Sequence, residues 1–113
     1  LPFHPAVRAG DYILVSGQVA KDADNNMIDG TIEEETRATI ETIERILAQE
    51  GATLADVVRA TTYLQDTRDF GRYNKVFGEM FKDAILARTT VEARAVINTK
   101  IEIDCIAYKP LKK

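Results

Sequence analysis

The residues best suited to chemistry are an arginine and a glutamate in two strand-like segments between residues 87 and 108. Alternation places Arg88 and Thr90 on one face of the first segment, and Glu102 on the polar face of the second. Arg88 and Glu102 are therefore predicted to share one polar face of a sheet. A guanidinium grips a planar carboxylate through two parallel hydrogen bonds, and a nearby carboxylate can move protons or activate water. This pair predicts a small hydrolytic site for a carboxylate-bearing metabolite.

Composition narrows the class of protein. The chain has 113 residues, which predicts one domain spanning residues 1–113. A net charge of −3 argues against nucleic acid as the main ligand. One cysteine and one histidine rule out an internal disulfide and leave no zinc cluster to build, so no metal site is expected. No apolar run approaches the roughly 20 residues that span a bilayer and no secretory signal is visible, so the expected compartment is the cytoplasm.

The spacing of apolar residues predicts five strands and two helices in the order ββ-α-β-α-ββ. Thr31 and Glu34 have the spacing of a helix capping box, and Gly51 is a natural helix stop. The expected elements are a hairpin (6–8 and 12–16), a helix (31–51), a strand (57–64), a helix (70–81) and two strands (87–95 and 100–108). The aromatic residues of the second helix are expected to be core.

Two helices can cover only one face of a sheet, so the pattern predicts a two-layer α+β sandwich with a mixed sheet. The other face is expected to stay uncovered by helices and to mix charged with apolar side chains. Its predicted members are Leu14, Arg88, Thr90, Glu92, Glu102, Asp104, Ile106 and Tyr108. A mixed face of this size favours burial against other copies of the chain.

Six strings occur in a characteristic order, namely AVRAGDYILVSGQ, TIEEETRATIETIERIL, GATLADVVRATTYLQD, DFGRYNKVF, ARTTVEA and IEIDCIA. Together they resemble the Rid/YjgF-like family of reactive intermediate deaminases, also labelled endoribonuclease L-PSP, and the similarity runs from about Phe3 to Pro110. The resemblance implies a chorismate-mutase-like fold and a homotrimer with sites between subunits. It also implies hydrolysis of 2-imino acids, formed from 2-enamino acids such as 2-aminoacrylate, to 2-keto acids and ammonia, without a cofactor.

The resemblance also implies roles for individual residues. By position, Arg88 matches the carboxylate-binding arginine and Glu102 the glutamate that activates water. The matches expected to bind substrate are Phe3, Ser16, Gly17, Asn74 and Thr90. Phe3 stands where many members have a tyrosine, and Thr90 where a cysteine is common. Loss of the tyrosine hydroxyl is expected to alter substrate orientation or selectivity.

Other functions remain open at this point. The family label suggests a ribonuclease or translation inhibitor, although the acidic balance counts against RNA. A non-catalytic ligand-binding or chaperone-like trimer is a second alternative, and a mutase is suggested by fold class alone. Within the deaminases, the segment LPFHPAV is closer to a branch linked to pyrimidine breakdown, which predicts 3-aminoacrylate as an alternative substrate. Arg88 and Glu102 could also be only a structural ion pair.

Overall fold

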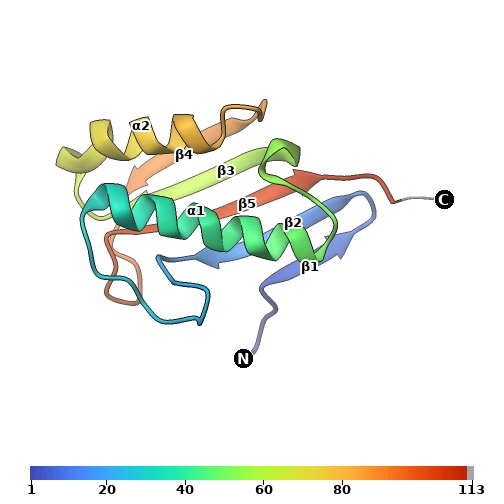
Figure 1. The fold of residues 1–113 in the computed structure, drawn as a ribbon, viewed down its shortest axis with the longest axis horizontal. Coiled ribbons are helices and arrows are strands. Elements are labelled where there is room, and N and C mark those ends of the chain that lie inside the picture. The colour runs from blue at the N-terminus through green and yellow to red at the C-terminus, as the bar shows by residue number, and fades with distance from the viewer. Residues whose placement is uncertain (112–113) are drawn as a thin grey trace.

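The computed structural model describes residues 1–111 and contains one five-stranded sheet with both helices against one of its faces (Figure 1). The elements are β1 (Ala6–Ala9), β2 (Tyr12–Gln18), α1 (Ile32–Gln49), β3 (Val57–Leu64), α2 (Phe70–Met80), β4 (Ala87–Glu92) and β5 (Ile101–Tyr108). The predicted α+β sandwich and its element order are confirmed. Strand β4 ends at Glu92, which is earlier than predicted. None of the helices among residues 1–111 is long and apolar enough to cross a membrane.

The last strand of the chain lies in the middle of the sheet, because the strand order is β1-β2-β5-β3-β4. Neighbouring strands are antiparallel except for β3 and β4, which are parallel. Parallel neighbours need a crossover connection, and α2 supplies it. Strand β5 is therefore held by β2 on one side and β3 on the other, and β4 forms an edge of the sheet.

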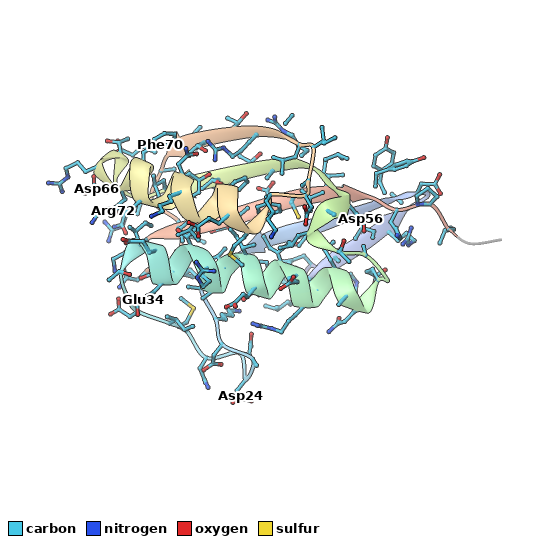
Figure 2. The ribbon with its side chains drawn as sticks, turned by 45° about the horizontal axis from the view of Figure 1, so that its top comes forward. Asp24, Glu34, Asp56, Asp66, Phe70 and Arg72 are labelled. Carbon is cyan, nitrogen blue, oxygen red and sulfur yellow. The ribbon has the colours of Figure 1, made fainter. Side chains whose placement is uncertain are left out.

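Helix α1 begins and ends where the local sequence predicts. The Thr31 Oγ1 atom accepts a hydrogen bond from the Glu34 backbone N–H at 3.1 Å, and the Glu34 carboxylate accepts one from the Thr31 N–H at 2.8 Å. This capping box satisfies N–H groups that have no partner inside the helix. Gly51, with φ of +75°, ends the helix in a conformation that other residues rarely adopt. Figure 2 shows Asp24 at the tip of the loop that precedes α1.

The core lies between the helices and the sheet. Its largest fully buried side chains include Ile13, Ile40, Ile43, Leu47, Leu64, Tyr73, Ile101 and Ile103. The predicted core role of the α2 aromatics holds for Tyr73, Phe77 and the following Phe81, which are buried, whereas Phe70 is exposed.

One buried charge fixes the start of β5. Glu35 on α1 is 2% exposed, and its carboxylate accepts hydrogen bonds from the Lys100 backbone N–H at 3.0 Å and from Lys100 Nζ at 3.1 Å. The hydrogen bond to Glu35 raises the pKa of Lys100. A paired and hydrogen-bonded carboxylate tolerates burial, but removal of its partner is costly. Because Lys100 directly precedes β5, this contact helps to set the position of Glu102.

The helix-free face of the sheet matches only part of the prediction. Register pairs Leu14 with Ile106 and Tyr12 with Tyr108, and Glu102 and Asp104 point to the same side as these residues. Leu14 and Tyr108 are 43% exposed, so this face is apolar as well as acidic. The remaining three predicted members, Arg88, Thr90 and Glu92, lie on the helix side. They pair in register with Ala60, Thr62 and Leu64, whose side chains are buried beneath the helices.

Candidate functional site

Arg88 and Glu102 lie on opposite faces of the sheet, so the predicted shared face is wrong. Alternation along β4 separates its two sets of side chains, but only pairing with β3 decides which set faces the helices. That pairing places Arg88 beside Ala60, and Ala60 beside Cys105, on the helix side. Glu102 pairs with Tyr63 on the helix-free side. A single copy of the chain therefore holds two separate groups of the predicted residues.

Helix α2 surrounds the Arg88 guanidinium with aromatic rings. Its central carbon lies 4.8 Å from the ring centre of Phe77, 5.3 Å from that of Tyr73 and 5.9 Å from that of Phe70. Figure 2 shows Phe70 on the first turn of α2. Guanidinium stacking on aromatic faces is favourable and restricts the side chain. The α2 aromatics thus serve the core and also hold the charged end of Arg88.

The Arg88 guanidinium has no polar partner within residues 1–111. None of the hydrogen bonds or ion pairs in this part of the chain involves it. All three ring centres lie within 6 Å of the guanidinium carbon, and no group in residues 1–111 accepts a hydrogen bond from its N–H groups. This arrangement suits the binding of an external carboxylate, since the fork of donors is already oriented.

Two other predicted residues lie on β4 and α2, the elements that hold Arg88. Thr90 is two residues along the same face of β4, and its Oγ1 atom lies 3.0 Å from the Tyr73 hydroxyl. Asn74 follows Tyr73 on α2 and is exposed. We call Arg88, Thr90 and Asn74 the arginine group. Arg88 and Thr90 lie on β4 at an edge of the sheet, and Asn74 lies on α2.

Glu102 lies against a glycine in the neighbouring strand. The register between β2 and β5 shifts between Val15 and Gln18, which places a bulge at Ser16 and Gly17. A Cβ atom added to Gly17 would lie 2.1 Å from Glu102 Oε2, closer than any real contact. Glycine therefore lets the carboxylate rest directly on the β2 backbone.

The surroundings of Glu102 favour its protonated form. Burial raises the pKa of Glu102, and the negative charge of Asp104 raises it further. Asp104 accepts a hydrogen bond from the Tyr63 hydroxyl at 2.9 Å, which orients it on the same face. The Glu102 carboxylate accepts no hydrogen bond from residues 1–111. A carboxylate with a raised pKa and free oxygens can serve as a general base near neutral pH.

A cleft of about 570 Å³ opens beside Glu102. Phe3 and Gly17 line it together with apolar residues from two other segments, Ile46 of α1 and Ile97 of the β4–β5 connection. Ser16 does not line the cleft but stabilises its wall. The Ser16 hydroxyl donates a hydrogen bond of 2.7 Å to the His4 carbonyl oxygen. This bond ties the segment that carries Phe3 to β2. We call Phe3, Ser16, Gly17 and Glu102 the glutamate group.

Sequence reasoning overlooked the hydroxyl role of Tyr73 and the lining role of Ile97. The sequence predicts Tyr73 only as core, yet a buried tyrosine hydroxyl needs a hydrogen-bond partner, and that need is a usable signal. Ile97 lies in an irregular segment whose position depends on the whole sheet, so no local signal was present. Cys105 is excluded as a nucleophile, because burial raises the pKa of its thiol to about 12.

No group of histidine, cysteine, aspartate and glutamate side chains in residues 1–111 has the arrangement of a metal site. The two groups offer a guanidinium without a polar partner in residues 1–111, a carboxylate with a raised pKa, hydroxyls and an amide.

The sequence and the fold both match one known family. The family model described as Endoribonuclease L-PSP matches residues 1–109. The chain belongs to the endoribonuclease L-PSP family. This is the Rid/YjgF family whose motifs the sequence resembles, and its match covers both the arginine group and the glutamate group.

Relatives within the L-PSP family span almost the whole chain. A RutC family protein of Pyrococcus abyssi is 40% identical over 110 residues, covering 96% of this chain and 87% of the relative. The mitochondrial protein mmf2 of Schizosaccharomyces pombe is 42% identical over 110 residues, covering 94% and 86%. The solved structure of yeast Mmf1 superimposes with a TM-score of 0.90 at 27% identity, covering 95% of this chain and 86% of that one.

Proposed function

We propose that this protein is a hydrolytic deaminase that converts 2-imino acids, and the 2-enamino acids from which they form, to 2-keto acids and ammonia. The observation that carries the proposal is that the chain presents two chemically complementary groups at separate places on its surface. One presents a guanidinium without a polar partner, and the other presents a carboxylate with a raised pKa beside a cleft. The motifs that resemble those of the Rid/YjgF-like deaminases support the same activity.

The active site is proposed to form between copies of the chain in a homotrimer. The arginine group lies at the edge strand β4, and the glutamate group lies on the helix-free face of the sheet. Within one copy the sheet separates them. The helix-free face is partly apolar, and an adjoining copy that covered it with its β4 edge could bring its Arg88 toward Glu102. Each site then has an arginine group from one subunit and a glutamate group from another.

The chemical steps require little beyond these two groups. Arg88 holds the substrate carboxylate and so fixes the position of the imine carbon. Glu102 takes a proton from a water molecule as the water oxygen attacks that carbon. Glu102 returns that proton to nitrogen to give the carbinolamine. The hydroxyl proton of the carbinolamine then moves to nitrogen as the carbon–nitrogen bond breaks, and ammonia and a 2-keto acid leave. The sum is one imine and one water giving one ketone and one ammonia.

Three alternatives are separable by experiment. Ribonuclease or translation-inhibiting activity is disfavoured because the helix-free face carries Glu102 and Asp104, which repel phosphates. A non-catalytic ligand-binding or chaperone-like trimer would bind keto acids without turnover. Turnover of 3-aminoacrylate in preference to 2-aminoacrylate would indicate a role in pyrimidine breakdown.

A location of the protein in the cytoplasm stays a prediction.

The first experiment measures keto acid release from freshly generated 2-aminoacrylate, with RNA cleavage followed on the same purified sample. Pyruvate should form faster than in the protein-free control, and RNA should stay intact. RNA cleavage without pyruvate formation would reject the deaminase. Sedimentation at micromolar concentration should give about three times the chain mass, and a monomer would reject the shared site.

A second experiment tests the division of the site between subunits. Arg88→Ala and Glu102→Gln should each be nearly inactive alone. When the two variants are unfolded, mixed equally and refolded together, about one quarter of the sites should receive an intact residue from each subunit. Activity should then return to about that fraction of the wild type. No recovery from mixed, correctly assembled trimers would place both residues in one subunit or outside the site. The matched control mixes each variant with itself.

A further inference from the structure

Three hydroxyl groups form a chain beneath the arginine group. The Tyr73 hydroxyl donates a hydrogen bond of 2.7 Å to Thr62 Oγ1 and lies 3.0 Å from Thr90 Oγ1. Tyr73 and Thr62 are both fully buried, whereas Thr90 is half-buried and reaches the surface beside Arg88. The Tyr73 ring also lies against the Arg88 guanidinium, with 5.3 Å between the ring centre and the guanidinium carbon. One residue of α2 therefore contacts both side chains of β4 that are expected to bind substrate.

Counting protons assigns a direction to this chain. A phenol hydroxyl has a single proton, and that of Tyr73 is directed to Thr62. In the contact between Tyr73 and Thr90, the proton must then come from Thr90. A threonine hydroxyl also has only one proton, so Thr90 directs it inward to Tyr73. Its lone pairs are open to an external donor, so Thr90 presents a hydrogen-bond acceptor beside Arg88.

An acceptor at this place distinguishes the substrate from the product of the proposed reaction. An imine or iminium nitrogen has N–H groups that can donate to Thr90, whereas the carbonyl oxygen of a 2-keto acid can only accept. With the carboxylate of either molecule on Arg88, the acceptor favours the nitrogen compound and opposes the keto acid. It also stabilises positive charge on nitrogen, which makes the imine carbon more electrophilic.

We propose that Tyr73 is a positioning residue that holds the Thr90 hydroxyl as an acceptor and thereby selects the N–H-bearing substrate over its keto acid product. The inference rests on the proposed function, since it assigns the substrate nitrogen to Thr90. It follows from the direction of the chain Thr90–Tyr73–Thr62, in which two buried residues determine what a third presents at the surface.

Two substitutions that do not touch the substrate should reverse the direction. Tyr73→Phe keeps the ring beside Arg88 but removes the acceptor of the Thr90 proton. Thr62→Val removes the acceptor of the Tyr73 proton, which then turns to Thr90. In both variants the Thr90 hydroxyl no longer has to donate to Tyr73. It can turn outward and donate a hydrogen bond to a carbonyl oxygen. Pyruvate should bind more tightly by roughly 3- to 10-fold, the range of one net hydrogen bond. The Michaelis constant for the imine of pyruvate should rise by a similar factor.

The experiment measures pyruvate binding by calorimetry. It also measures the Michaelis constant for the imine of pyruvate, which an amino acid oxidase generates from alanine in the assay. Thr39→Val is the matched control, because Thr39 is also a buried threonine but donates to the Glu35 carbonyl oxygen within α1. It should leave both constants unchanged. In Tyr73→Phe combined with Thr90→Val, the gain in pyruvate affinity should disappear.

The possible outcomes separate the acceptor role from a merely structural one. Tighter pyruvate binding in both variants, lost in the combined variant, supports the acceptor role. Equal changes for pyruvate and imine, or no change, reject it. If Tyr73→Phe fails to fold, Thr62→Val decides the question. A variant that is merely destabilised should bind pyruvate and the imine more weakly by the same factor. Absence of imine turnover by the wild type rejects the proposed function instead, while pyruvate binding still reports the direction of the Thr90 hydroxyl.

Discussion

Gly17→Ala should impair turnover while leaving the fold intact. The added Cβ atom meets Glu102 Oε2 at 2.1 Å and the Glu102 Cδ atom at 3.0 Å, whereas ordinary contacts begin at 3.4 Å. The carboxylate oxygen must therefore retreat by about 1 Å or more, and a misplacement of this size can cost about 10²-fold in rate. We expect kcat to fall by about that factor.

Stability should change little in the same variant. Gly17 is not one of the glycines with positive φ, so its backbone accepts alanine. Replacing glycine at a compatible position stabilises by about 0.4–1 kcal/mol through the unfolded state. Moving Glu102 off its preferred rotamer costs about 0.5–1.5 kcal/mol. These effects offset each other, so the free energy of unfolding should stay within about 1 kcal/mol of the wild type.

The assay compares kcat for imine hydrolysis with the melting temperature and the sedimentation coefficient. Gly78→Ala is the matched control, because a Cβ at Gly78 has no neighbour within 4 Å. Its kcat should equal that of the wild type, and its stability should rise by up to about 1 kcal/mol as alanine replaces glycine in a helix. Wild-type turnover by a folded, assembled Gly17→Ala protein would refute the role of Gly17 in positioning Glu102.

Further predictions concern the two groups of the site. Arg88→Lys keeps the charge but loses the fork, so pyruvate affinity should fall about 10-fold, and Arg88→Ala should lose about 100-fold, measured by calorimetry. Glu102→Gln should still bind pyruvate while kcat falls about 10²-fold or more, and normal kcat with early melting would make Glu102 structural. Glu102 acts as its carboxylate, so activity should be lost as pH falls through its raised pKa. Asp104→Asn removes a charge that raises this pKa, so the acid limb of the rate profile should move to lower pH, and an unmoved limb would exclude Glu102 as its origin. Phe3→Tyr should alter relative rates among small, branched and aromatic imino acids more than it alters stability, and unchanged ratios would show that Phe3 does not set selectivity.

Local interactions made the elements predictable. The capping box of Thr31 and Glu34, the stop at Gly51 and the β-branched run of β3 all act over a few neighbouring residues. Each of these signals can therefore be predicted from the sequence alone. The same holds for the division of β4 and β5 into two faces, because strand alternation is a property of the backbone. Side-chain chemistry predicted Arg88 and Glu102, and the resemblance to the family supplied the substrate-binding candidates.

Tertiary pairing decided what alternation left open. Arg88 faces α2 because β4 lies parallel to β3 with Arg88 opposite Ala60, and nothing within β4 determines that register. Glu102 rests on Gly17 because β5 enters between β2 and β3, which joins residues far apart in the chain. The hydroxyl chain from Thr90 through Tyr73 to Thr62 likewise joins β4, α2 and β3. These relations depend on which elements pack together, so the separation of the arginine group from the glutamate group emerged only from the folded sheet.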